Sequence, residues 1–156
     1  MLKKVISGGQ TGVDRAGLDA AMAAGIPVGG FCPKGRTAED GTIPDNYPLE
    51  ELTSYRYYMR TEKNIVESDG TLIINKGHLT EGTKLAYDFT AKNGKPRLVI
   101  QLDADQVIHP ELVIKWIKAQ RITTLNIAGP RESKFPDGIH KEAYYYLEQV
   151  FTLLEN

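Results

Sequence analysis

The stretch that decides the fold is Ser7–Arg15, SGGQTGVDR, together with the segments on either side of it. Before it, Lys3–Ile6 (KKVI) ends in β-branched residues, as a short buried strand would. After it, Ala16–Ala24 consists of strong helix formers interrupted only by Gly17. A strand that runs through a glycine-rich turn into a helix is how parallel α/β domains present backbone N–H groups to an anion. We therefore expect the rest of the chain to supply the other walls of an anion-binding site.

Strand and helix signals go on alternating along the chain. Strands are predicted at Ile26–Phe31, Thr71–Asn75, Arg97–Leu102 and Thr124–Ala128, and helices at Tyr57–Glu67, Gly82–Lys92, Pro110–Ala119 and from about Asp137 to Leu154. Residues 32–50 carry three prolines and two glycines and are predicted to be a long irregular segment, which is usually functional or disordered.

This alternation predicts the fold class and the place of the site. Five short strands between helices indicate one α/β domain over residues 1–156. We expect a Rossmann-like, doubly wound, mainly parallel sheet of about five strands, with helices on both faces. Ligands of such sheets bind at the carboxyl ends of the strands, near the point where the strand order reverses.

The composition excludes several classes of partner. The formal net charge of −1 gives no electrostatic footprint for nucleic acid or an anionic membrane. No apolar run approaches the roughly 20 residues of a membrane span, and no signal-peptide segment is visible. The single cysteine, Cys32, fits a reducing compartment, and the three histidines lack metal-ligand spacing. We expect a cytoplasmic protein with no protein-ligated metal and with no nucleic-acid or membrane partner.

The first loop carries more polar groups than a simple turn needs. Gln10 and Thr11 are suited to hydrogen-bond a ligand, Asp14 to accept from a ribose or base, and Arg15 to pair with phosphate. The glycines Gly8, Gly9 and Gly12 do not form the GxGxxG pattern of dinucleotide-binding loops, and no lysine follows the last of them as in a Walker A loop. The alternative is a tight strand–helix turn in which Asp14 is an ordinary first-turn charge.

Two further segments supply candidate binding residues. Lys34 and Arg36 lie in the long segment and either fold over the site as a cationic lid or belong to a solvated turn. Thr61 and Asn64 are three residues apart on a predicted helix, so they lie on adjacent faces. Just before the third strand, Asp69, Gly70 and Thr71 are also candidates, although Asp69–Gly70 is turn chemistry by itself.

Two later strand ends complete the predicted site. Gly82 and Thr83 open a helix and are either a second phosphate-binding helix start or an ordinary capped helix. The segment AGPRES (128–133) follows the last strand and contains Gly129, Pro130, Arg131 and Glu132. A proline-rigidified turn places Arg131 well for a bidentate contact with phosphate, while Glu132 is suited to bind a sugar hydroxyl; the alternative is a plain strand-exit turn.

The chain resembles the molybdenum carrier family, which is similar to the circularly permuted YpsA branch of the SLOG superfamily. The matching segments are residues 7–21 (SGGQTGVDRAGLDAA), 29–41 (GGFCPKGRTAEDG), 68–74 (SDGTLII), the Gly82–Thr83 pair and 125–133 (LNIAGPRES). The resemblance implies a Rossmann-like fold that binds a nucleotide, a nucleotide-derived ligand or a pterin cofactor. It also implies a homo-oligomer, because oligomers are common in the superfamily.

Three functions are compatible with this resemblance. The first is a binding protein that holds a small phosphate-bearing ligand, either molybdenum cofactor (molybdopterin) or a nucleotide. The second is a nucleotide-processing hydrolase, as in the related phosphoribohydrolases, which place a glutamate three residues after their glycine–threonine pair. Here that position is Ala86, so Glu81 or Glu132 would have to substitute. The third is a nucleotide-sensing module that acts on a partner protein.

Overall fold

The computed structural model describes residues 1–154, which form one central sheet with two small two-stranded sheets beside it. The five strands of the central sheet are all parallel and lie in the order β2-β1-β9-β7-β8. Their bounds are β1 Lys4–Ile6, β2 Val28–Gly29, β7 Gly70–Asn75, β8 Arg97–Gln101 and β9 Thr124–Ala128. The expected doubly wound, parallel α/β fold is confirmed.

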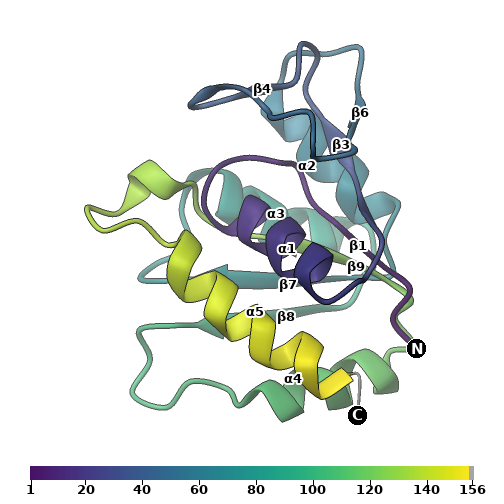
Figure 1. The fold of residues 1–156 in the computed structure, drawn as a ribbon, viewed down its shortest axis with the longest axis vertical. Helices are drawn as coiled ribbons and strands as arrows, with labels where there is room; N and C mark the ends of the chain where they lie inside the picture. The colour runs from purple at the N-terminus through teal and green to yellow at the C-terminus, as the bar shows by residue number, and fades with distance from the viewer. Residues whose placement is uncertain (155–156) are drawn as a thin grey trace.

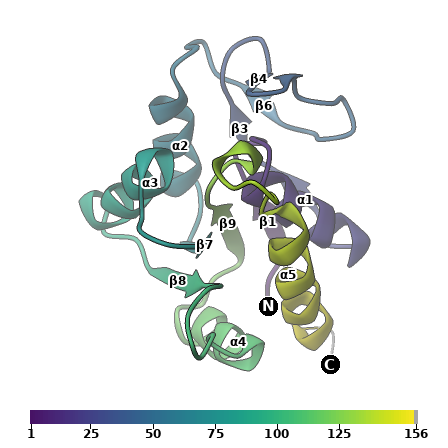
Figure 2. The same ribbon diagram turned by 90° about the vertical axis from the view of Figure 1, so that its left-hand side faces the viewer.

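Helices cover both faces of this sheet (Figures 1 and 2). One face is covered by α1 (Val13–Ala23), α4 (Pro110–Ala119) and α5 (His140–Leu154), and the other by α2 (Tyr57–Val66) and α3 (Glu81–Lys92). Helix α1 lies close against β9 because it has Gly17 there, where a Cβ atom would meet the side chain of Ile127 at 2.8 Å. None of the helices in residues 1–154 is long and apolar enough to cross a membrane.

Residues 31–51 form what we call the cap segment, which lies at one end of the molecule, above α1 and beside α2 (Figures 1 and 2). It contains β3 (Phe31–Cys32) paired with β6 (Glu50–Glu51), and a hairpin of β4 (Thr37–Ala38) and β5 (Gly41–Thr42). It also has a small core, in which buried side chains of the cap segment pack against Leu18 of α1: Cys32, Ala38, Ile43, Tyr47 and Leu49.

The cap segment corrects two predictions. The continuous strand at Ile26–Phe31 is wrong, because the backbone turns at Gly30 (φ 127°) and β3 leaves the central sheet. Only glycine fits there, since a Cβ atom would overlap the backbone of Ser7. Residues 32–50 are largely irregular, as predicted, with only two-residue strands, and they are organised around Arg36, whose guanidinium donates hydrogen bonds to four backbone carbonyls of residues 43–49. Arg36 is thus a structural centre of the cap and not a free cation of a lid.

Candidate ligand-binding site

A pocket of about 290 Å³ lies at the carboxyl edge of the central sheet. Its walls come from the loop after β1, the end of β9 and the turn that follows it, and the first turns of α2 and α3. Strands β1 and β9 lie in the middle of the sheet, where the direction of the strand order reverses. From β1 the chain continues outward to β2 on one side, and from β7 it continues outward to β8 on the other. The volume lies at the lower end of the range for small-molecule sites, roughly 300–1,000 Å³.

The structure brings ten of the twenty predicted site residues into the lining of this pocket. They are Gly8, Gln10, Asp14, Thr61, Asn64, Gly82, Thr83, Gly129, Pro130 and Arg131. The other ten lie outside the lining: Gly9, Thr11, Gly12, Arg15, Lys34, Arg36, Asp69, Gly70, Thr71 and Glu132.

The floor of the pocket holds a buried ion pair that the sequence did not predict. Arg60 on α2 donates a hydrogen bond to the carbonyl oxygen of Gly8 (3.0 Å) and pairs with the Asp14 carboxylate at 3.4 Å. The backbone N–H of Gln10 also donates to Asp14 (3.2 Å). Burial raises the pKa of Asp14 from 3.8 to about 6, while the charge of Arg60 opposes this rise. A carboxyl group of such pKa, facing a pocket, is suited to exchange a proton near neutral pH.

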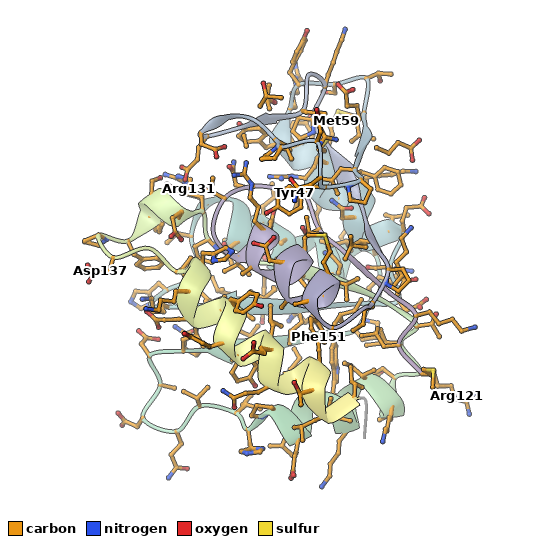
Figure 3. All side chains as sticks on the ribbon, viewed as in Figure 1. Tyr47, Met59, Arg121, Arg131, Asp137 and Phe151 are labelled. Atoms are coloured by element: carbon orange, nitrogen blue, oxygen red, sulfur yellow. The ribbon has the colours of Figure 1, made fainter. Side chains whose placement is uncertain are left out.

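The rim of the pocket carries a network of charges centred on Arg131, which lies beside the short 3₁₀ helix η1 (Glu132–Lys134; Figure 3). The guanidinium of Arg131 pairs with Glu81 at the start of α3 and, at 3.3 Å, with Glu39 of the cap segment. Lys134 lies 3.9 Å from Glu81. Arg131 lowers the pKa of Glu81, and hydrogen bonds from Ser133 and Thr11 lower the pKa of Glu39 against the opposing effect of its burial. Both carboxylates are therefore charged at neutral pH.

The loop after β1 does not offer its backbone donors to the pocket in the way the sequence suggested. The N–H of Gly9 donates to the hydroxyl of Ser7 (3.3 Å), that of Gln10 to Asp14, and that of Thr11 to the side-chain oxygen of Gln10 (3.0 Å). Side chains of the loop itself therefore occupy the donors that were expected to cradle a phosphate.

Arg15 also takes a different role from the predicted one. Its guanidinium makes a bidentate pair with Asp40 of the β4–β5 turn (2.6 and 2.8 Å) and donates to the carbonyl oxygen of Gly9 (2.9 Å). Arg15 thus holds the cap segment on α1. The cation that faces the pocket at this level is Arg60.

Three predicted residues, Asp69, Gly70 and Thr71, lie at the opposite edge of the sheet, because they precede β7 or begin it. Asp69 accepts hydrogen bonds from the backbone N–H groups of Thr123 (3.0 Å) and Thr124 (2.9 Å), which tie the start of β9 to β7. These bonds lower the pKa of Asp69.

Glu132, predicted to bind a sugar hydroxyl, instead accepts hydrogen bonds from the N–H groups of Ile139 and His140 (2.7 and 2.8 Å). It therefore caps the N-terminus of α5, where unpaired donors are exposed. Lys34 stands over the ring of Tyr55, outside the pocket.

The pocket contains residues that were not predicted from the sequence, among them Glu39, Tyr57, Tyr58, Arg60, Asn126 and Lys134. Asn126 had a visible signal, since it is a polar residue in the middle of the apolar strand TLNIA. It is 3 % exposed and donates to Thr71. Arg60 had no local signal, because its partners lie 46 and 52 residues away in sequence.

Comparison with known proteins agrees with this architecture. Residues 5–151 match the Circularly permutated YpsA SLOG family. The chain belongs to this family. Among solved structures, this SLOG chain is similar to one described as "Putative molybdenum carrier protein" from Syntrophus aciditrophicus SB, with 44% identity, a TM-score of 0.88, and 96% of this chain and 94% of that chain covered. No protein of the curated set matches.

A second solved structure, (E)-4-hydroxy-3-methyl-but-2-enyl diphosphate reductase, shares 13% identity with this SLOG chain at a TM-score of 0.38, covering 99% of this chain and 59% of the reductase. That likeness is too slight to carry an argument.

Within residues 1–154, no group of three or more His, Cys, Asp or Glu residues is placed to hold a metal ion.

Proposed function

We propose that this protein binds a small phosphate-bearing heterocycle, either a nucleotide or molybdopterin, in the pocket at the carboxyl edge of the sheet. The observation that carries the proposal is the distribution of charge in the pocket. A buried Arg60, paired with Asp14, lies at the floor, and Arg131 and Lys134 lie on the rim beside Glu81. A bound phosphate would take the place of these carboxylates as the partner of the cations. Arginine suits phosphate oxygens because its fork of donors matches their geometry.

The remaining wall suits a flat ring. Leu85, Ala86, Ile127 and the rings of Tyr57 and Tyr58 line the pocket, while Asn64 and Asn126 add amide groups. An apolar lining with a few convergent polar groups is the usual composition of a small-molecule site. In the molybdopterin case, the same cations would hold the phosphate, the apolar wall would face the pterin, and the cofactor would itself carry the molybdenum.

Calorimetry with nucleoside phosphates and with purified molybdopterin tests this proposal and distinguishes the two ligands. Native mass spectrometry of protein gently purified from its own host provides an independent identification from the bound mass. We expect Arg131→Ala to weaken binding at least roughly tenfold, because one charge-assisted hydrogen bond to phosphate contributes about 1.5–3 kcal/mol. Arg15→Ala is the matched control, since Arg15 pairs with Asp40 and lies outside the pocket lining. Failure of both ligand classes to bind, or equal affinity in Arg131→Ala, would refute the proposal.

A second candidate function, hydrolysis of a nucleotide at its glycosidic bond, is favoured by one observation. Asp14 faces the pocket with a pKa of about 6, which is suitable for a general acid or base near neutral pH. The glutamates considered from the sequence are occupied, Glu81 by Arg131 and Glu132 by the start of α5. Release of free base from nucleoside monophosphates, lost in Asp14→Asn, would assign this activity; binding without release would restrict the protein to a carrier or sensor.

A further inference from the structure

A group of exposed aromatic side chains lies beside the pocket, at the start of α2. Of the nine large apolar side chains exposed within residues 1–154, four lie in the five positions 55–59. Tyr55 is 65% exposed, Tyr57 43%, Tyr58 44% and Met59 44%; Met59 is labelled in the upper part of the molecule in Figure 3. Exposed large apolar side chains that gather in one short segment indicate a candidate binding surface. Tyr57 and Tyr58 also line the pocket, so this surface continues from it.

Cations alternate with these rings. The Nζ atom of Lys34 stands 5.3 Å from the ring centroid of Tyr55, and the guanidinium of Arg56 donates to the hydroxyl of Tyr58 (3.1 Å). Below them, Arg60 stands 5.3 Å from the ring centroid of Tyr57. We call Lys34, Tyr55, Arg56, Tyr57 and Tyr58 the aromatic–basic strip.

The two outer cations of the strip have no acidic partner. Lys63 on the same helix pairs with Glu67, and Lys84 on α3 pairs with Asp88. In contrast, neither Lys34 nor Arg56 makes an ion pair with any carboxylate of residues 1–154. Exposed rings interleaved with unpaired cations fit a ligand that has flat bases joined by phosphates, because bases stack on aromatic rings and phosphates pair with cations.

The strip is too short for a polymer. It offers two unpaired cations, and the whole chain has a formal net charge of −1. Proteins that hold long nucleic acids neutralise many phosphates at once, and their affinity depends on that number. The surface therefore matches a ligand in which a short phosphate bridge joins the group in the pocket to one further base outside it.

We propose that the aromatic–basic strip is a second nucleotide subsite, and that the ligand of this protein is a dinucleotide. One half occupies the pocket, where Tyr57 and Tyr58 belong to the lining, the phosphate bridge crosses at Arg56, and the second base stacks on Tyr55 outside it. This inference rests on the proposed function of the pocket, and it adds that the second half binds on the surface outside it.

Calorimetry with paired ligands tests the inference. The probes are adenosine monophosphate and diadenosine diphosphate, with their guanosine, cytidine and uridine counterparts, titrated into the wild-type protein. We expect the dinucleotide that contains the preferred base to bind roughly tenfold more tightly than the mononucleotide, as one additional stacked base would provide. Tyr55→Ala combined with Arg56→Ala should remove this gain and leave mononucleotide affinity unchanged.

Two control variants separate stacking from other causes. Tyr55→Phe keeps the ring and should keep most of the gain. Tyr145→Ala removes another exposed tyrosine (54%), from α5, and should have no effect. Thermal unfolding of each variant checks that the exposed substitutions leave the fold intact.

The other outcomes are distinct. Binding of the mononucleotide without a gain for the dinucleotide would overturn the strip as a subsite and leave the pocket proposal standing. No binding of any nucleotide would also overturn the strip, and the pocket proposal would fall with it only if molybdopterin does not bind either. If affinity for single-stranded DNA keeps rising beyond two nucleotides, the strip binds a polymer and the dinucleotide proposal is overturned. A dimer in solution that Tyr55→Ala dissociates would overturn it too, by assigning the strip to a second copy of the chain.

Discussion

Replacing Asp14 by asparagine tests whether the buried carboxylate at the pocket floor lowers the free energy of unfolding when it is ionised. Asp14 is 7% exposed, and burial raises its pKa from 3.8 to about 6. A carboxyl group whose pKa is higher in the folded state than in the unfolded state keeps its proton longer when folded. Its contribution to the free energy of unfolding is therefore present below pH 3.8 and is lost as the pH rises through 6.

The magnitude follows from the two pKa values. A difference of about two units corresponds to about 3 kcal/mol over the whole interval, of which about 2 kcal/mol falls between pH 4.5 and pH 7.5. Urea unfolding of the wild type and of Asp14→Asn at these two pH values measures the quantity directly. We expect the free energy of unfolding of the wild type, relative to the variant, to fall by about 2 kcal/mol between the lower and the higher pH.

The comparison between two pH values isolates the titration of Asp14. In the variant Arg60 lacks this partner at both pH values, so this cost cancels in the difference. Asp69→Asn is the matched control, since hydrogen bonds from Thr124 and Thr123 lower the pKa of Asp69 and its contribution is lost only as the pH falls below 3.8, so this variant should show almost no difference between the two pH values. An Asp14→Asn protein with the pH dependence of the wild type would refute the assignment of a raised pKa at the pocket floor.

The remaining predictions concern the scaffold. Arg36→Ala should lower the free energy of unfolding by at least about 2 kcal/mol, because four carbonyls lose a charged donor, and should open residues 31–51 to proteases; resistance equal to wild type would contradict this. Gly129→Ala should cost about 1–3 kcal/mol in urea unfolding, since a Cβ atom there would overlap β7 and α1, whereas Gly82→Ala has open space and should be nearly neutral. Asp19 raises the pKa of His140, so His140→Asn should lose stability relative to wild type at pH 6 and much less at pH 9; equal losses at both values would exclude the contact.

The fold was predictable because the sequence patterns that specify its strands and helices are local and recur along the chain. Each β-branched run bounded by turn residues became a strand of the central sheet, and the alternation with helices fixed the parallel class. The exception at Gly30 arose from a long-range cause, the close approach of its backbone to Ser7, which nothing in the run IPVGGF reveals.

The candidate site was predictable only in part, because a loop position does not determine what a side chain contacts. The carboxyl ends of β1 and β9 and the start of α3 do meet at one pocket, as parallel strands require. Arg15 and Arg131 looked equivalent in sequence, yet one pairs with Asp40 in the cap segment and the other stands on the pocket rim. Asp69 was misplaced because its position before a strand puts it at the wrong edge of the sheet.

The separate core of the cap segment implies that the protein has two levels of local stability. Amide protons of the five-stranded sheet should exchange with deuterated water only on global unfolding, whereas those of β3 to β6 should exchange through a smaller, independent opening. Such an opening would lift Glu39 and Asp40 away from Arg131 and Arg15 while the sheet stays intact. The frequency of that local event, and not the stability of the whole molecule, would then set how fast a ligand enters and leaves.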